Sequence, residues 1–218
     1  MKSVIKLDTS KGNIYFCSDL HYNHSNIFKH CSSTRSRFSD LPEMNSWLRE
    51  NIFECLSEDD TLIDLGDTFW KVETEEIKEI LGSCKARKIK IMGNHDAYGL
   101  YYPPQKPLEE YYEIITDLLD ISIRHEGKDY WLSLCHYPMV SWNHKSFGSL
   151  MIHGHCHGNI DDFNNQSPDL RVDVGCDGSL CSSLGGGLVN FTDILEHFRL
   201  KVGDLDFYKH IKKKGINL

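Results

Sequence analysis

The chain has 218 residues and a formal net charge of −8, with 40% hydrophobic and 26% charged residues. Its mass of 25.2 kDa fits one domain, residues 1–218, with a substantial core. No apolar stretch is long enough to span a bilayer and the amino terminus lacks the apolar core of a secretory signal, so we expect no membrane partner. The acidic balance argues against long nucleic acid as a partner, because binding to its phosphates needs a basic surface.

The first half of the chain alternates predicted strands and helices. Ser39 or Asp40 can cap a helix that has Pro42 in its first turn, followed by an apolar stripe at helical spacing. Thr74 is placed to cap a shorter helix that ends at Gly82. This alternation is typical of a layered α/β fold. Apolar runs predict strands at Val4–Leu7, Ile14–Ser18, Thr61–Leu65 and Lys88–Met92.

The second half is predicted to add further strands and two helices. Helical periodicity predicts a helix over Leu108–Leu119, and Thr192 can cap a final helix. A glycine-rich loop is expected over Ser179–Gly187, without the spacing or the lysine of a phosphate-binding loop. The other predictions are a hairpin over Asp120–Tyr130, strands at Tyr130–Cys135 and Leu170–Gly175, and an apolar run from Leu150 that ends at Gly154.

The eight cysteines point to a reducing compartment. They are scattered without a C-x-x-C pair, and several fall in apolar segments where a free cysteine acts as a small hydrophobe. With no export signal, we expect reduced thiols and a cytoplasmic location. Cys176 and Cys181 form the one closely spaced pair, and a second metal site or a redox pair there is a minor alternative.

Metal-type ligands directly follow five of the predicted strands. Open α/β sheets place their ligand sites at the carboxyl ends of the strands, so a single metal site accounts for all five signals. The residues concerned are Asp19 and His21, Asp67, Asn94 to Asp96, His136, and His155 with His157.

The segment from His155 to His157 carries the strongest single signal. An extended backbone would aim the His155 and His157 imidazoles to one side and Cys156 to the other. Imidazole is the commonest protein ligand for transition metals, and the flanking glycines let backbone and ions approach closely. Taken alone, the segment leaves open a surface loop that is rich in histidine.

The ordered motifs resemble those of the calcineurin-like metallophosphoesterase superfamily, and the residues of their loops are similar to those of small bacterial and phage members. The resemblance implies an α/β fold in which a two-sheet β-sandwich is flanked by helices in four layers (αββα), with two divalent metals between the sheet ends. The motifs are Asp19-x-His21, Gly66-Asp67, Gly93-Asn94-His95-Asp96, His136 and Gly154-His155-x-His157.

The resemblance also implies a role for each residue. His95 would be the general acid at the leaving oxygen, a role suited to an unperturbed pKa of about 6.5; the alternative is that it only orients a neighbour. Asp96 is expected to orient neighbours or cap a helix. The first metal would be held by Asp19, His21 and His157, the second by Asn94, His136 and His155, and Asp67 would bridge both.

Such a site supports hydrolysis of phosphate esters. Two cations about 3.5 to 4 Å apart neutralise phosphate oxygens and lower the pKa of a bridging water, which supplies hydroxide for in-line attack. Mixed nitrogen and oxygen ligation suits Mn, Fe, Zn or Ni, of which we favour manganese. We therefore expect a phosphoric ester hydrolase acting on a phosphodiester or a small phosphomonoester, such as a nucleotide. A nuclease acting on nucleic-acid ends and a non-catalytic metal-binding scaffold remain the alternatives.

One departure from the superfamily bears on the substrate. Its serine/threonine phosphatases carry Gly-Asp-x-x-Asp-Arg-Gly, whereas Gly66-Asp67 continues here as Thr-Phe-Trp-Lys, which disfavours a phosphoprotein. Arg35 or Arg37 could supply the missing guanidinium, with a solvated loop arginine as the alternative for each. His24 could reach the pocket, with a purely structural role as the alternative. We expect specificity to lie in the loops Tyr22–Arg37, Tyr98–Pro107 and Ser141–Gly148.

Overall fold

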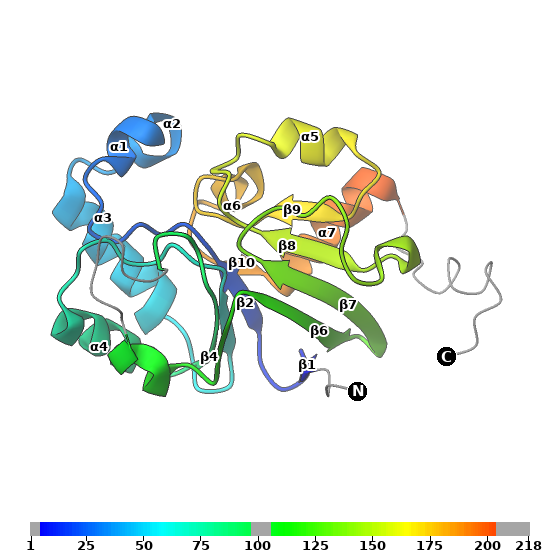
Figure 1. The fold of residues 1–218 in the computed structure, drawn as a ribbon, viewed down its shortest axis with the longest axis horizontal. Coiled ribbons are helices and arrows are strands. Elements are labelled where there is room, and N and C mark those ends of the chain that lie inside the picture. The colour runs from blue at the N-terminus through cyan, green and yellow to red at the C-terminus, as the bar shows by residue number, and fades with distance from the viewer. Residues whose placement is uncertain (1–4, 97–105, 204–218) are drawn as a thin grey trace.

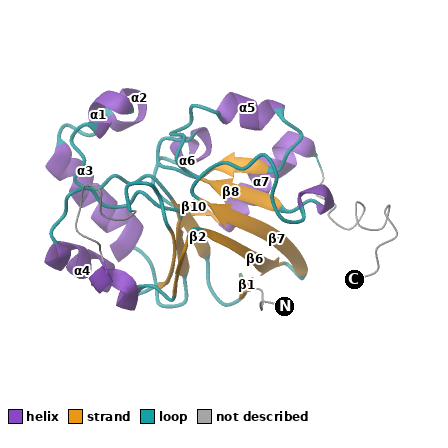
Figure 2. Ribbon diagram, in the orientation of Figure 1, coloured by secondary structure: helices purple, strands orange, loops and turns teal. Residues whose placement is uncertain are grey.

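The computed structural model describes residues 5–96 and 106–203. Among these residues, two mixed five-stranded sheets lie face to face, with helices at the periphery (Figures 1 and 2). This arrangement confirms the expected α/β sandwich. The strand order is β10-β2-β3-β4-β5 in the first sheet and β1-β6-β7-β8-β9 in the second. The strands are β1 (Ile5–Asp8), β2 (Ile14–Cys17), β3 (Thr61–Asp64), β4 (Arg87–Ile91), β5 (Ile114–Thr116), β6 (Leu118–His125), β7 (Lys128–Cys135), β8 (Leu150–His153), β9 (Arg171–Asp173) and β10 (Val189–Asn190).

Alternating side chains of the first sheet build two separate cores. In β2, Ile14 and Phe16 belong to the core between the sheets, whereas Cys17 belongs to the core on the outer face. In β3, Ile63 is inside and Leu62 is outside. Because successive side chains of a strand point to opposite faces, a sheet with apolar residues on both faces must be covered on both.

Helices cover the outer face of the first sheet. Asp40 caps α3, as predicted, by accepting a hydrogen bond from the backbone N of Glu43 (2.9 Å). Met44 of α3 and Ile80 of α4 then pack with Leu62 of the sheet. Among the described helices, none is long and apolar enough to cross a membrane. The helices are α1 (Ile27–His30), α2 (Ser32–Arg35), α3 (Leu41–Leu48), the π-helical η1 (Arg49–Glu54), α4 (Thr74–Ser83), the 3-10 helices η2 (Lys106–Tyr111) and η3 (Lys145–Phe147), α5 (Asp161–Gln166), α6 (Ser179–Ser183) and α7 (Phe191–Val202).

The second sheet combines an antiparallel hairpin with parallel strands. Strands β6 and β7 form the predicted hairpin, and β7, β8 and β9 run parallel to one another. Asn164 of α5 accepts from Arg171 Nε (2.7 Å) and contacts His153 Nε2 (3.1 Å), which fixes α5 against β8 and β9. Phe191 and Phe198 of α7 extend the core between the sheets.

The two sheets meet at one edge, where the carboxyl ends of their parallel strands converge. The backbone N of Asp19 donates to the Gly66 carbonyl (2.9 Å), which joins the loops after β2 and β3. The backbone N of His155, after β8 in the other sheet, donates to Asp19 Oδ2 (2.9 Å). The edge predicted to carry the ligands is therefore held by hydrogen bonds both within the first sheet and between the two sheets.

The predicted helix over Leu108–Leu119 is wrong. The 3-10 helix η2 ends at Tyr111, and Ile114–Thr116 forms strand β5. Ile114 pairs in parallel with Ile89 of β4, so an open sheet edge recruited this β-branched segment. Local periodicity could not anticipate this pairing.

Three smaller predictions also need correction. Part of the expected glycine-rich loop is helix α6. The cap of α7 is Asn190, whose side chain accepts from the backbone N of Thr192 (3.0 Å), with Asp193 completing a capping box. Thr74 is the first residue of α4, where Glu73 is the N-cap, and the helix runs one residue past Gly82.

Candidate metal centre

Five of the predicted ligands adopt left-handed backbone conformations. Their φ values lie between 48° and 69°, a region that non-glycine residues enter at a cost of about 1–2 kcal/mol each. Such strain concentrates at functional sites, where the surrounding structure holds a side chain in a required direction. The five residues are Asp19, His21, Asp67, His155 and His157.

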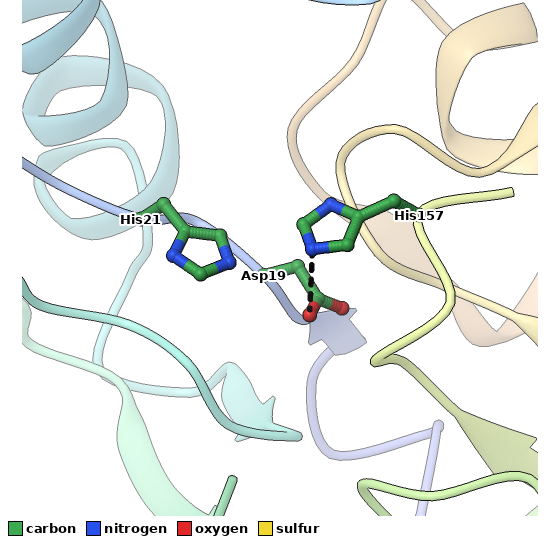
Figure 3. Close-up of side chains that lie close together, drawn as sticks. All are labelled: Asp19, His21 and His157. Carbon is green, nitrogen blue, oxygen red and sulfur yellow. Dashed lines mark ion pairs between the residues drawn. The ribbon is translucent and has the colours of Figure 1, made fainter. Parts of the chain in front are cut away.

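The first cluster consists of Asp19, His21 and His157 (Figure 3). The three donor atoms lie within 4.8 Å of one another, with Asp19 Oδ1 3.7 Å from His157 Nε2. The His21 and His157 rings are stacked with their centroids 5.1 Å apart. The structure therefore brings together the three residues expected at the first metal.

The second cluster consists of Asp67, His136 and His155, again with donor atoms within 4.8 Å of one another. His136 is fully buried, and its Nε2 lies 3.4 Å from Asp67 Oδ2 and 3.2 Å from Asn94 Oδ1. His136 Nδ1 donates to the Leu65 carbonyl (2.7 Å), which turns Nε2 toward the cluster. All four residues assigned here by the resemblance thus meet, whereas the bridging role of Asp67 stays a prediction.

Two glycines allow the loops to approach this closely. A Cβ on Gly154 would overlap Ser18 Oγ and Asp19 Oδ2, and a Cβ on Gly93 would overlap Asp67 Oδ1. Glycine is therefore required where β8 and β4 end, since any side chain there would push the loops and the Asp19 and Asp67 carboxylates apart.

The first cluster combines a neutral imidazole with buried carboxylates and a second imidazole that is held by hydrogen bonds. Burial lowers the pKa of His21 to about 3, so its ring is neutral and can offer a lone pair. Burial raises the pKa of Asp19, and the neighbouring Asp173 carboxylate raises it further. Burial also lowers the pKa of His157, but its hydrogen bonds to Asp177 and Cys31 outweigh this effect and raise it to about 11. A positive charge on the His157 ring therefore compensates the negative charges of the buried Asp19 and Asp177 carboxylates.

Buried polar atoms that lack a hydrogen-bond partner indicate whether these residues fit a metal. Asp19 Oδ1 and His21 Nε2 are buried and have no hydrogen-bond partner within the described part of the chain. A buried polar atom without a partner costs about 1–3 kcal/mol, so such atoms are rare unless something else satisfies them. Both atoms belong to one cluster of oxygen and nitrogen donors, and a divalent cation fits that donor set.

The sequence profile of calcineurin-like phosphoesterases matches residues 12–183, a span that holds both clusters. The chain belongs to the calcineurin-like phosphoesterase family. Membership indicates metal-dependent hydrolysis of phosphate esters, and it confirms the superfamily that the motifs predicted.

This calcineurin-like phosphoesterase is similar to one further protein in sequence and to one solved structure in fold. An uncharacterized protein of Methanocaldococcus jannaschii is 31% identical over 166 residues, which are 74% of this chain and 81% of that protein. A crystal structure of a protein of unknown function from Aquifex aeolicus is 25% identical, covers 84% of this chain and 98% of that one, and superposes with a TM-score of 0.59. The second likeness supports the fold.

His95 and His24 stand beside the clusters of this calcineurin-like phosphoesterase. The backbone N of His95 donates to Asp67 Oδ1 (2.8 Å), and its ring Nε2 lies 3.9 Å from Asp67 Oδ2. The His95 side chain is 36% exposed, so a substrate can reach it. The His24 ring stacks on Trp70 with centroids 4.1 Å apart, 5.2 Å from His21. The expected loop Tyr98–Pro107 lies largely outside the described residues.

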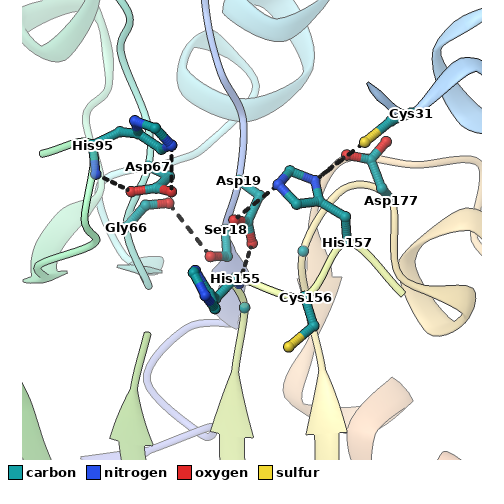
Figure 4. Close-up of polar contacts among 12 residues, drawn as sticks. Ser18, Asp19, Cys31, Gly66, Asp67, His95, His155, Cys156, His157 and Asp177 are labelled. Carbon is teal, nitrogen blue, oxygen red and sulfur yellow. Dashed lines mark hydrogen bonds and ion pairs between the residues drawn. The ribbon is translucent and has the colours of Figure 1, made fainter. Parts of the chain in front are cut away.

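The predicted reason for the His155 and His157 convergence is wrong, although the rings do reach the site. The strand ends at His153, and both residues are left-handed rather than extended. The two imidazoles consequently enter different clusters, while Cys156 points away (Figure 4). A turning backbone separates side chains that an extended one would align.

The structure does not bring the predicted arginines to the side chains of the clusters. Arg35 is buried and donates to Asp177 and to backbone carbonyls. Arg37 packs over the Phe38 and Trp47 rings and donates to the Gly185 carbonyl. Neither arginine contacts a cluster side chain through these bonds. The burial of Arg35 argues against a phosphate contact, whereas a phosphate contact by the exposed Arg37 stays a prediction.

Sequence reasoning missed the carboxylates that support the ligands. Asp173 ends β9 and Asp177 follows it, which repeats the pattern of strand and acidic residue seen at the other ligand strands. Asp96 accepts from the backbone N of Asp67 (2.7 Å) and pairs with buried Lys90 (2.9 Å), which confirms its predicted orienting role. The same pattern could have identified Asp173 and Asp177.

Proposed function

We propose that this calcineurin-like phosphoesterase hydrolyses a phosphodiester or a small phosphomonoester, such as a nucleotide, using two divalent cations. Manganese is the favoured metal, and the two clusters supply the ligands. The observation that carries the proposal is that the orphaned, buried donor atoms of Asp19 and His21, whose imidazole is neutral, lie in one cluster at a shared strand edge. When bound there, the cations would neutralise phosphate oxygens and lower the pKa of a water molecule.

The residues of the chain divide the remaining tasks. The Asn94 side chain would offer an uncharged amide oxygen as a ligand. Because this oxygen adds no negative charge, the site with bound cations would keep enough positive charge to attract an anion. His95 is placed beside Asp67 with a partly exposed ring, from which it can give a proton to the leaving oxygen. His24, stacked on Trp70, forms the neighbouring wall against which the substrate is proposed to bind.

The test is hydrolysis of two chromogenic esters by purified protein supplied with Mn²⁺. Bis-p-nitrophenyl phosphate reports diesterase activity and p-nitrophenyl phosphate reports monoesterase activity. We expect turnover of at least one, and a loss of at least a hundredfold for Asp67→Asn, because Asp67 belongs to the second cluster and is proposed to bridge the metals. Asp8→Asn is the matched control, since Asp8 ends β1 and is hydrogen-bonded to Ser10 away from both clusters.

Two alternative functions predict different results in this assay or in a separate binding measurement. A non-catalytic scaffold would retain two metals per chain yet leave a broad panel of esters untouched. A nuclease would bind DNA with a strong dependence on salt, because phosphate binding releases counterions. The net charge of −8 speaks against the second alternative.

A further inference from the structure

The geometry points to Arg35 and Asp177 as positioning residues of the first metal site. Together they fix the ring of His157 and the backbone of Asp19, two of the three members of the first cluster. This inference rests on the metal-binding part of the proposed function. It assigns a buried ion pair to metal affinity rather than to substrate binding.

Asp177 sets which nitrogen of His157 faces the cluster. Asp177 Oδ2 lies 2.9 Å from His157 Nδ1, so Nδ1 donates its proton to the carboxylate (Figure 4). The other nitrogen, Nε2, is the one that lies 3.7 Å from Asp19 Oδ1. A carboxylate behind a ligating histidine fixes the ring orientation and makes the ring a stronger ligand.

Arg35 in turn holds the Asp177 carboxylate. Its Nε donates to Asp177 Oδ1 (2.8 Å) and its Nη2 to Asp177 Oδ2 (2.9 Å), a bidentate geometry that lysine cannot reproduce. The side chains are only 3% and 2% exposed, so the pair is shielded from solvent. Thr34 adds a hydroxyl that donates to Asp177 Oδ1. These hydrogen bonds therefore hold the Asp177 carboxylate in place beside His157.

The same guanidinium reaches the other side of the cluster. Arg35 Nη2 donates to the carbonyl of Asp19 (2.7 Å), and Nη1 donates to the carbonyl of Leu20 (3.2 Å). These bonds hold the loop in which Asp19 and His21 both have left-handed backbone. One buried side chain thus connects the first loop after β2 with the segment after β9.

A competing reading makes Cys31, His157 and Asp177 a metal site of their own, since their donor atoms also lie within 4.8 Å of one another. Arg35 argues against it. Its guanidinium already occupies both oxygens of Asp177, and a cation placed there would face that positive charge at close range. The Cys31 thiol, 3.4 Å from His157 Nδ1, is accordingly a neighbour of the hydrogen bond and not a ligand.

The two sites differ in this respect. The ring of His136 in the second cluster is oriented by a neutral peptide carbonyl, that of Leu65, whereas His157 is oriented by a carboxylate. Loss of the ion pair should therefore weaken the first metal selectively. A general loss of stability would not distinguish the two sites.

Metal titration of the stripped full-length chain tests the inference. Mn²⁺ binding is measured by calorimetry, and bound Mn²⁺ is counted after gel filtration. We expect two ions per wild-type chain. In Arg35→Lys and Asp177→Asn, we expect the Mn²⁺ affinity of one of the two sites to fall at least tenfold, within the range of about 10–100-fold typical of such supporting groups. Arg171→Lys is the matched control, because Arg171 is equally buried but bonds to Asn164 and the Met139 carbonyl.

Several outcomes would overturn the inference. One is that folded Arg35→Lys and Asp177→Asn variants bind two ions with wild-type affinity; another is that Arg171→Lys weakens the same site equally. Zn²⁺-loaded wild-type protein labelled with ¹⁵N-histidine gives a readout that needs no variant. We expect His157 to keep its proton on Nδ1, and a metal on Nδ1 would refute the assignment. All these readouts are independent of hydrolysis, so an inactive protein that binds two ions refutes only the proposed function.

Discussion

The candidate ligands carry a conformational cost that can be measured residue by residue. His155 has φ of 69°, and its ring in the second cluster is partly exposed and lies 4.7 Å from the Tyr137 ring and 5.1 Å from the His136 ring, between centroids. Side chains in this region clash with their own backbone, and only glycine avoids the clash. The fold tolerates this strain at positions whose side chains converge on one point, which ties the strain to function.

Replacing His155 by glycine and by alanine separates strain from ring loss. We expect metal-free His155→Gly to be more stable than His155→Ala by about 1 kcal/mol, because both lose the ring and only glycine relieves the clash. Urea unfolding monitored by circular dichroism measures the difference. At Lys78, inside α4, the same pair should show the opposite order by about 1 kcal/mol, because glycine weakens a helix. Equal free energies of unfolding for His155→Gly and His155→Ala would contradict the proposed backbone strain at this position.

The leaving group decides how much an enzyme needs a general acid. If His95 protonates the leaving oxygen, His95→Gln should slow hydrolysis of an alkyl phosphate ester by about 10²–10⁴-fold. The p-nitrophenyl ester should be affected far less, because p-nitrophenolate leaves without a proton. Steady-state kinetics on the two esters gives the ratio, with His125→Gln, in the β6–β7 hairpin, as the control. An equal loss on both esters would limit His95 to orienting its neighbours.

At the scale of elements, the start of β3 depends on one buried carboxylate. Asp60 accepts four hydrogen bonds, from the backbone N of Asn13 (3.0 Å) and its Nδ2 (3.1 Å), and from the backbone N of Ser57 (2.9 Å) and its hydroxyl (2.7 Å). Burial alone would raise the pKa of Asp60, but these bonds outweigh it, so its pKa is lowered. In its charged form the carboxylate therefore ties together the segments that precede β2, follow η1 and precede β3.

Asp60→Asn should lower the free energy of unfolding by about 1–3 kcal/mol at pH 7, because the amide faces donors with its own NH₂. A carboxyl whose folded pKa is depressed stabilises above its unfolded pKa of about 3.9 and loses that contribution as the pH falls through the folded value. The difference from wild type should therefore shrink below about pH 4. Denaturant titrations at several pH values measure it. Exposed Asp59→Asn should change stability by less than about 0.5 kcal/mol.

At the scale of the molecule, the two candidate ligand clusters lie where the two sheets meet. Asp19, His21, Asp67 and Asn94 come from loops of the first sheet, and His136, His155 and His157 come from loops of the second. Bound cations would crosslink the sheets and neutralise buried carboxylates. The metal is therefore expected to stabilise the whole fold, in addition to its proposed chemical role.

Removal of the metal should lower the melting temperature of the protein. A ligand that binds only the folded state at about 100 times its Kd adds about 2.7 kcal/mol, so saturating Mn²⁺ should raise the melting temperature of chelator-treated protein by several degrees. Differential scanning fluorimetry across a Mn²⁺ series measures the shift. Asp67→Asn should show a smaller shift, and a wild-type melting temperature that ignores Mn²⁺ would exclude binding where the two sheets meet.

The sequence by itself located the carboxyl ends of the five ligand-bearing strands to within one residue, and it determined the residues that follow them and the family. These are local signals, because an apolar run followed by Asp, Asn or His is visible without knowing its neighbours in space. It could not determine that Ile114–Thr116 would pair with β4, since edge pairing depends on a distant strand. Helical periodicity misled there for that reason.

Only the tertiary structure decided how the ligands are held. The left-handed turns that send His155 and His157 into separate clusters come from packing between the sheets, as does the pairing of Arg35 with Asp177 across 142 positions of sequence. Sequence reasoning took Arg35 for a solvated or phosphate-binding side chain. Burial and hydrogen-bond partners arise from non-local contacts, and these changed its role from substrate contact to support of a ligand.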